Sequence, residues 1–204
     1  MWLVSKMYDW FMRDAEDACL RDWRRELLAD AEGRVLEVGV GTGANLPLYP
    51  DAVTELVVVE PDRHMRAQLS AKLGDEIERD IEILDADAER LPFDDASFDT
   101  VVSTLVMCSV GDLKEALSEI HRVLRPGGRF IFLEHVAAHD KPGRRKWQER
   151  IEPVWKRFTG NCHLTRETSE QIETAGFDIE SMTRESMRKA LPIVRPTVRG
   201  IARR

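Results

Sequence analysis

The sequence has few cysteines: Cys19, Cys108 and Cys162 are the only three among its 204 residues. They lie far apart along the chain, and no pair has the CxxC spacing typical of zinc sites and redox centres. We therefore expect neither a metal site nor a disulfide framework. A chain of this kind is typical of a reducing compartment, and we expect it in the cytoplasm.

The sequence also lacks long hydrophobic runs and an excess of positive charge. No apolar stretch approaches the roughly 20 residues that cross a bilayer, and the first residues, MWLVSKMYDWFM, carry charges where a signal peptide has its apolar core. The net charge of −7 argues against a general nucleic-acid binder, because such proteins are usually basic. We expect a soluble protein that binds no nucleic acid.

What is present indicates a globular fold that alternates strands and helices. Near-continuous apolar, β-branched runs are typical of strands buried on both faces. Helical patterns at 62–73 and 112–124 separate some of these runs, which predicts a parallel, doubly wound α/β sheet. Near the end, 177–186 and 196–204 have the pattern of two strands joined by a turn, and thus of a hairpin. The five central strands are expected at Arg34–Val38, Glu55–Val59, Ile81–Leu84, Asp99–Ser103 and Arg129–Leu133.

Two further segments have helical patterns. The first covers roughly residues 6–29, and its apolar face is expected to pack on the sheet. This face includes Met7, Trp10 and Phe11, with Leu3 just before the segment. A mobile lid over a ligand or a lipid-contacting surface are the alternatives. In the second, Trp147 and Trp155 lie eight residues apart on one probable helix. We expect them to pack in the core, with a role in a ligand pocket as the alternative.

The stretch VLEVGVGTGANL (Val35–Leu46) carries the clearest ligand signal. It follows an apolar strand with Gly39, Gly41 and Gly43 at alternate positions, which suits a ligand that comes close to the backbone. The match to G-x-G-x-x-G/A taken alone would suggest a dinucleotide. However, Gly43 comes one position too early for that pattern, and the loop has no lysine or arginine to hold a diphosphate.

Acidic residues lie at or just after the ends of three predicted strands, at the same edge of the sheet. Glu60 lies where an acid chelates ribose hydroxyls. Asp87 is placed to accept a hydrogen bond from an adenine amine, and Glu37 to neutralise a cationic amino acid. An adenosine with a positively charged amino-acid tail fits this set better than a dinucleotide does. S-adenosylmethionine is that molecule.

In order and spacing, these motifs, with DADAERLPFDDASFD (Asp85–Asp99) and LRPGGRFIFLEH (Leu124–His135), resemble those of class I S-adenosylmethionine-dependent methyltransferases. The resemblance implies one Rossmann-like domain over 1–204, with seven strands, the last antiparallel, and helices on both faces. Residues 1–30 would form a helical cap, 31–136 the cofactor-binding half, and 137–204 the substrate-side helices and terminal hairpin. The expected cofactor contacts are Glu37, Gly39, Gly41, Gly43, Asn45, Glu60, Pro61, Asp87, Ala88, Thr104, Leu105 and Tyr8.

The second half resembles the methyltransferase-like thiol S-methyltransferases of the methyltransferase type 11 group. The resemblance rests on STLVMCSV (Ser103–Val110), LEHV (Leu133–Val136), WQERIEPVWK (Trp147–Lys156) and GNCHLTRET (Gly160–Thr168). It implies a small lipophilic thiol as acceptor and a monomer or homodimer. Animal members have a hydrophobic N-terminal anchor, which is not seen here.

His135 and His163 are the candidate general bases, each with a structural role as the alternative. Cys108 is expected to be a small buried hydrophobe.

Other functions stay open at this point. NLPLYP (Asn45–Pro50) also resembles phosphatidylethanolamine N-methyltransferases, so a phospholipid or another small N- or O-acceptor is the alternative. Basic residues over 184–204 would then attract an anionic membrane surface, unless they are merely solvated. A non-catalytic binding protein of the same fold and an NAD-dependent oxidoreductase are weaker alternatives. An arsenite methyltransferase is disfavoured, since the cysteines show no cooperating set.

Overall fold

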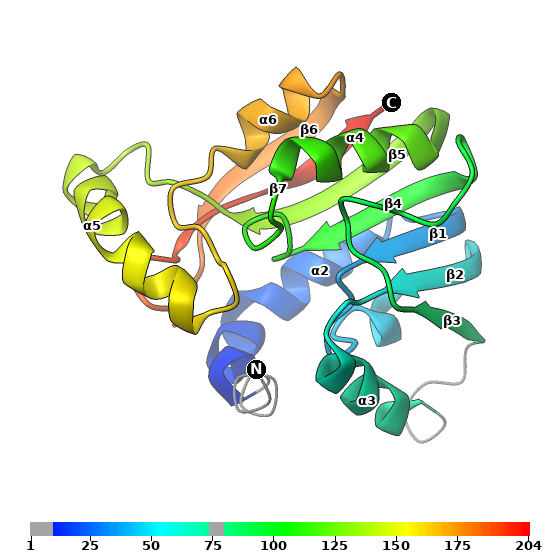
Figure 1. Ribbon diagram of the computed structural model, residues 1–204, viewed down its shortest axis with the longest axis horizontal. Coiled ribbons are helices and arrows are strands. Elements are labelled where there is room, and N and C mark those ends of the chain that lie inside the picture. The colour runs from blue at the N-terminus through cyan, green and yellow to red at the C-terminus, as the bar shows by residue number, and fades with distance from the viewer. Residues whose placement is uncertain (1–9, 74–79) are drawn as a thin grey trace.

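The computed structural model describes residues 10–73 and 80–204 and contains a seven-stranded sheet (Figure 1). The strand order is β3-β2-β1-β4-β5-β7-β6. β7 runs antiparallel to both of its neighbours, whereas β1 to β5 pair in parallel. The expected doubly wound sheet and terminal hairpin are therefore confirmed. The strands are β1 (Gly33–Val38), β2 (Val53–Val59), β3 (Ile81–Leu84), β4 (Phe98–Thr104), β5 (Leu124–His135), β6 (Asp178–Ser186) and β7 (Pro196–Arg203).

The apolar strand runs build a core on each face of the sheet, because successive side chains of a strand point to opposite faces. Val57 and Phe132 belong to the core beneath α4 (Leu113–Val123) and α6 (Thr168–Thr174). Their neighbours Val58 and Ile131 belong to the opposite core, which also includes residues of α2 (Arg21–Leu28) and α3 (Arg63–Lys72). Helices thus cover both faces of the sheet, as expected.

Two aspartates determine where helices begin at the carboxyl edge of the sheet. The side chain of Asp62 accepts hydrogen bonds from the backbone N–H groups of His64 and Met65 at the start of α3. Asp112 does the same for Lys114 and Glu115 at the start of α4. Each cap satisfies N–H groups that the first turn of its helix leaves unbonded, and so fixes where a helix begins after the carboxyl end of a strand.

The N-terminal segment is helical from residue 10, through a π-helical turn η1 (Glu16–Leu20), to the end of α2. Cys19 and Leu20 of this segment are buried against the sheet. Trp10 and Phe11, however, are 60% and 65% exposed, so the prediction that they pack on the sheet is wrong. They precede Met12 and Ala15, the first described residues of the segment that pack against this core. Leu3 and Met7 lie outside the described residues.

Helix α5 (Pro142–Phe158) stands beyond the carboxyl ends of the central strands rather than on a face of the sheet (Figure 1). Trp147 is therefore 59% exposed, and the prediction that it packs in the core is wrong, while Trp155 is half-buried. The buried amide of Gln148 anchors the helix: it accepts from Ala138 N and donates to the carbonyls of Val136 and Ile193. Within 10–73 and 80–204, no helix is both long and apolar enough to cross a membrane.

Candidate active site

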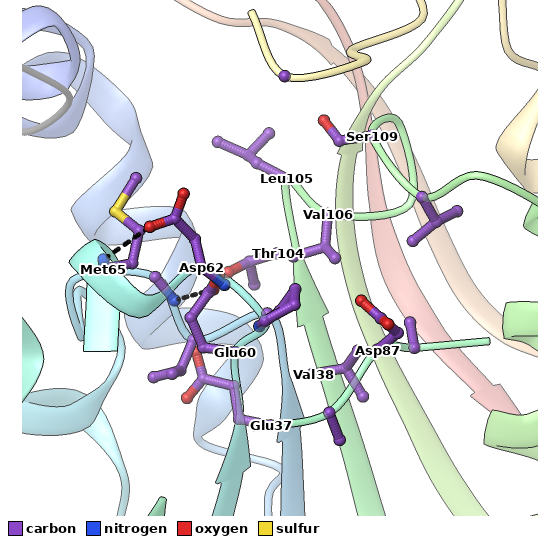
Figure 2. Close-up of a pocket in the computed structure, with 18 of the residues that line it drawn as sticks. Glu37, Val38, Glu60, Asp62, Met65, Asp87, Thr104, Leu105, Val106 and Ser109 are labelled. Atoms are coloured by element: carbon purple, nitrogen blue, oxygen red, sulfur yellow. Dashed lines mark hydrogen bonds between the residues drawn. The ribbon is translucent and has the colours of Figure 1, made fainter. Parts of the chain in front are cut away.

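A cavity of about 370 Å³ opens at the carboxyl edge of the sheet, around the ends of β1, β2 and β4 (Figure 2). β1 lies between β2 and β4, so the chain order along the sheet reverses direction here. Such switch points are where open α/β sheets bind ligands. The volume is in the range of small-molecule sites. Of the residues expected at the cofactor, Glu37, Gly39, Gly41, Glu60, Pro61, Asp87, Ala88, Thr104 and Leu105 line this cavity.

The three motif glycines all have positive φ, but their surroundings differ. A Cβ on Gly41 would meet no atom of the described residues within 4 Å, so this glycine exposes bare backbone to the cavity. A Cβ on Gly39 would lie 2.5 Å from Val106, a neighbour across the cavity wall. Gly43 does not line the cavity, and a Cβ there would lie 2.7 Å from Leu69 of α3. Close packing of the loop on α3 accounts for Gly43, whereas Gly41 leaves room for a ligand.

Glu60 ties the glycine loop to the start of α3. One carboxylate oxygen accepts from the backbone N–H of Gly41 at 2.9 Å, and the other from that of Asp62 at 2.9 Å. The side chain is mostly buried, and burial raises its pKa above the ordinary value, although these two hydrogen bonds act to lower it. Glu60 thus presents a fixed acid at the cavity edge (Figure 2).

Glu37 lies at the end of β1 in a buried hydrogen-bond network. Its carboxylate accepts from the side-chain amide of Asn45 at 2.9 Å and from the hydroxyl of Tyr49 at 2.8 Å. Burial raises the pKa of Glu37 to about 7, although these bonds and the charge of Arg24 act in the opposite direction. Asn45 lies behind the cavity wall and does not line it, so it orients Glu37.

Arg24 is a cavity residue that the sequence did not indicate. Although it belongs to α2, its guanidinium is buried at the cavity and donates to Asn45 Oδ1 at 2.9 Å and to Thr104 Oγ1 at 2.6 Å. Its charge is paired with Glu16, with 3.1 Å between Nη2 and Oε1. No local motif marks this arginine, because its partners come from segments up to 80 residues away.

A second unforeseen residue, Glu134, shapes the loop after β4. Its buried carboxylate accepts from the backbone N–H groups of Val106 and Met107 and from the hydroxyl of Ser103, all within 3.1 Å. Leu105, which lines the cavity, is held at φ +61 at the start of this loop. Left-handed backbone at a bulky residue is strained, and it persists where the surroundings determine it. Glu134 supplies that constraint.

Neither candidate base lines the cavity. His135 is buried, and its Nε2 lies 2.9 Å from Cys162 Sγ. His163 pairs with Glu152, with 3.4 Å between Nδ1 and the carboxylate, and burial lowers its pKa. Strand β5 directs His135 away from the cavity, toward the segment between α5 and α6. Tyr8, which was also predicted to contact the cofactor, lies outside the described residues.

The structure corrects the expectation that the cysteines do not cooperate. Cys108, from the loop after β4, and Cys162, from the α5–α6 segment, converge with His135 at the end of β5. Their sulfur and nitrogen atoms all lie within 4.8 Å of one another. The signal was missed because the three positions are separated by at least 27 residues. Cys108 is buried, as expected.

The fold and the acid-lined cavity define an S-adenosylmethionine-dependent methyltransferase, and comparison with known proteins agrees. Residues 36–132 match the family model described as "Methyltransferase domain". A SAM-dependent methyltransferase structure from Thermotoga maritima, titled a possible histamine N-methyltransferase, superimposes with a TM-score of 0.69 at 22% identity. It covers 97% of this chain and 94% of its own. At that identity the likeness shows the fold.

The more specific matches are two human proteins. Thiol S-methyltransferase TMT1A is 35% identical over 170 residues, 82% of this chain and 69% of its own length. Thiol S-methyltransferase TMT1B is 38% identical over 164 residues, 78% of this chain and 66% of its own. The chain thus spans about two thirds of these relatives. It belongs to the methyltransferase family that includes them, and its cofactor is S-adenosylmethionine.

Proposed function

We propose that the protein transfers a methyl group from S-adenosylmethionine to a small lipophilic thiol. The observation that carries this proposal is the part of the cavity wall formed by Leu105, Val106 and Val110 together with Thr159 and Gly160. This wall is largely apolar. It suits an uncharged, lipophilic acceptor, and the likeness to the human thiol S-methyltransferases supports the same acceptor class.

The cavity does not favour a phospholipid acceptor. Among the described residues that line it, Arg24 carries the only cationic side chain, and its guanidinium is already bonded to Glu16, Asn45 and Thr104. A phosphate group would therefore find no free positive partner there. Two arginines of the terminal hairpin are also paired within the protein: Arg199 with Glu26 and Glu185, and Arg203 with Glu180.

The residues of the acidic end fit the cofactor. The bare backbone at Gly41 admits close approach, and Gly39 keeps the adjoining turn free of side chain. We assign the ribose hydroxyls to Glu60, the adenine to Asp87 and Ala88, and the cationic methionine end to Glu37. Pro61, Thr104 and Leu105 complete the wall, while Gly43 and Asn45 support it from behind.

The reaction needs little general acid–base catalysis from the protein. The cofactor supplies an activated methyl group on a sulfonium. The acceptor sulfur forms a bond to that carbon while the carbon–sulfonium bond breaks, and the electron pair stays on the departing sulfur. A thiol with a pKa of about 8.5 is partly ionised at neutral pH and loses its proton to water. The described cavity residues include no histidine or lysine, which suits such an acceptor better than an amine. Most of the rate then comes from alignment.

Release of S-adenosylhomocysteine from purified protein tests the proposal. An alkyl thiol, the matching alkyl amine and phosphatidylethanolamine vesicles are compared with a mixture without acceptor. We expect release that depends on the thiol, lost in Glu60→Gln and kept in Glu55→Gln, which alters an exposed acid of β2, the strand that Glu60 follows. Release with the amine or the vesicles alone would contradict the thiol assignment. If none of the acceptors gives release although the cofactor binds, methyl transfer is contradicted.

A further inference from the structure

A cluster of metal-ligating side chains lies outside the cofactor cavity. Cys108, His135 and Cys162 come from three separate segments, and their ligand atoms all lie within 4.8 Å of one another. His135 Nε2 and Cys162 Sγ are 2.9 Å apart. Two sulfurs and an imidazole nitrogen at these separations are close enough to share one bound ion.

The cluster is buried and only partly satisfied by the protein. Cys108 and His135 are 2% and 4% exposed, and Cys162 is half-buried. Cys108 Sγ contacts the Leu105 carbonyl at 3.6 Å and Ser109 Oγ at 3.5 Å. His135 Nδ1 is buried with no hydrogen-bond partner among the described residues. No described side chain bonds to Nδ1, and Nε2 lies beside Cys162 Sγ.

The backbone around the cluster is organised without an ion. His163 N donates to the Cys108 carbonyl at 2.7 Å, which joins the loop after β4 to the α5–α6 segment. Glu134 holds the Cys108 loop from the other side, since it accepts from the N–H groups of residues 106–108. Arg166 donates to the carbonyls of Met107 and Val110. The ligands are thus held in place before any ion arrives, which lowers the cost of binding one.

We propose that Cys108, His135 and Cys162 bind a thiophilic divalent metal ion of the Zn²⁺ type. Two cysteine thiolates and one neutral imidazole are a recurrent three-residue donor set for zinc, and they neutralise its charge. The set leaves one coordination position for a further ligand. Oxygen-preferring ions such as Mg²⁺ are excluded by the lack of oxygen donors in the set.

Such an ion would cross-link the segments that form the acceptor end of the cavity. Cys108 lies between Val106 and Ser109, both of which line the cavity, and Cys162 follows Gly160 on the opposite wall. The ion would fix the spacing of these walls and stabilise the fold, because it binds the native arrangement and not the separated segments of the unfolded chain. This consequence does not depend on which acceptor the protein methylates.

The experiment uses the full-length protein with its thiols kept reduced, freed of metal by chelation and titrated with Co²⁺ alone. We expect one equivalent to bind with the thiolate-to-cobalt charge-transfer and tetrahedral ligand-field absorption bands, and added Zn²⁺ to remove them. Cys162→Ser and Cys108→Ala should each weaken binding at least about tenfold. Cys19→Ala removes a buried cysteine from the opposite core and should bind like the parent. Zn²⁺ should raise the melting temperature of the parent and of Cys19→Ala only.

Cys162 is only half-buried, so Cys162→Ser decides the question even if Cys108→Ala fails to fold. Circular dichroism and cofactor affinity check that each variant is native. Absence of the thiolate bands in the reduced parent, or equal Co²⁺ affinity in folded Cys162→Ser, would overturn the metal site. Neither result bears on methyl transfer, which is measured separately by S-adenosylhomocysteine release.

Discussion

Protonation of Glu37 should couple cofactor binding to pH. Burial raises the pKa of this carboxyl to about 7, so in the cofactor-free protein it carries a proton for much of the time near neutrality. A cationic ligand end beside it favours the carboxylate, so binding below this pKa must release the proton. If binding requires the carboxylate, the dissociation constant rises by up to about tenfold for each pH unit below 7.

The stability of the cofactor-free protein should change in the opposite sense. An acid whose pKa is raised on folding contributes stability that is fully present below its unfolded-state pKa, here 4.5, and is lost as the pH rises through about 7. The difference between the two pKa values corresponds to about 3 kcal/mol for Glu37. Glu37→Gln removes the titrating group in a side chain of the same shape, so both pH dependences should flatten.

Isothermal titration calorimetry between about pH 5 and 7 measures the cofactor affinity, and buffers of different ionisation enthalpy report the released proton. This window lies below the titration of the ligand's own α-amino group, near 8. Glu55→Gln is the control, since Glu55 is exposed. A dissociation constant that does not change with pH in the parent, or that changes equally in Glu37→Gln, would refute the assignment of Glu37 to the cationic end.

Three further predictions concern the loops and the core. Gly41→Val should abolish cofactor binding measured by calorimetry and leave circular dichroism native, because the valine side chain would enter the cavity. The control is Gly127→Val in β5, at φ +78 with no described atom within 4 Å of its Cβ, and it should keep binding. Unchanged cofactor binding in Gly41→Val would contradict this prediction. Glu134→Gln should lower the free energy of unfolding by about 1–3 kcal/mol in urea, because the amide nitrogen would face the Cys108 N–H that the second carboxylate oxygen now accepts, and the remaining bonds would lose their charge. A smaller loss would mean that the loop keeps its shape without the carboxylate. Leu117→Ala should cost about 2–5 kcal/mol in the same assay, and a near-zero value would contradict its full burial between α4 and the sheet.

The strands and the acidic edge could be predicted because their signals are local. β3 begins and ends where the apolar run predicted, and β1 differs by one residue, because short apolar runs mark strands along the sequence. Glu37, Glu60 and Asp87 share an edge because each lies at or just after the carboxyl end of a strand in one parallel sheet. Their contacts with the cofactor stay predictions.

The exposure of Trp10 and Trp147 could not be predicted in the same way. Their helical spacing indicated an apolar face, but spacing does not say whether another element covers that face. Residue 10 precedes the part of the N-terminal segment that reaches the sheet, and α5 lies beyond the strand ends, held there by Gln148. Tertiary placement decides burial at both positions.

The sequence by itself determined the order of strands and helices, the glycine turn after β1 and the acids at the strand ends. Short-range sterics and hydrophobic periodicity act on neighbouring residues and need no knowledge of the fold. Only the tertiary structure brought Arg24 to the cavity, placed Glu134 under the loop after β4 and gathered Cys108, His135 and Cys162. Those contacts join residues tens of positions apart, and they exist only once the sheet has closed the chain segments onto one another.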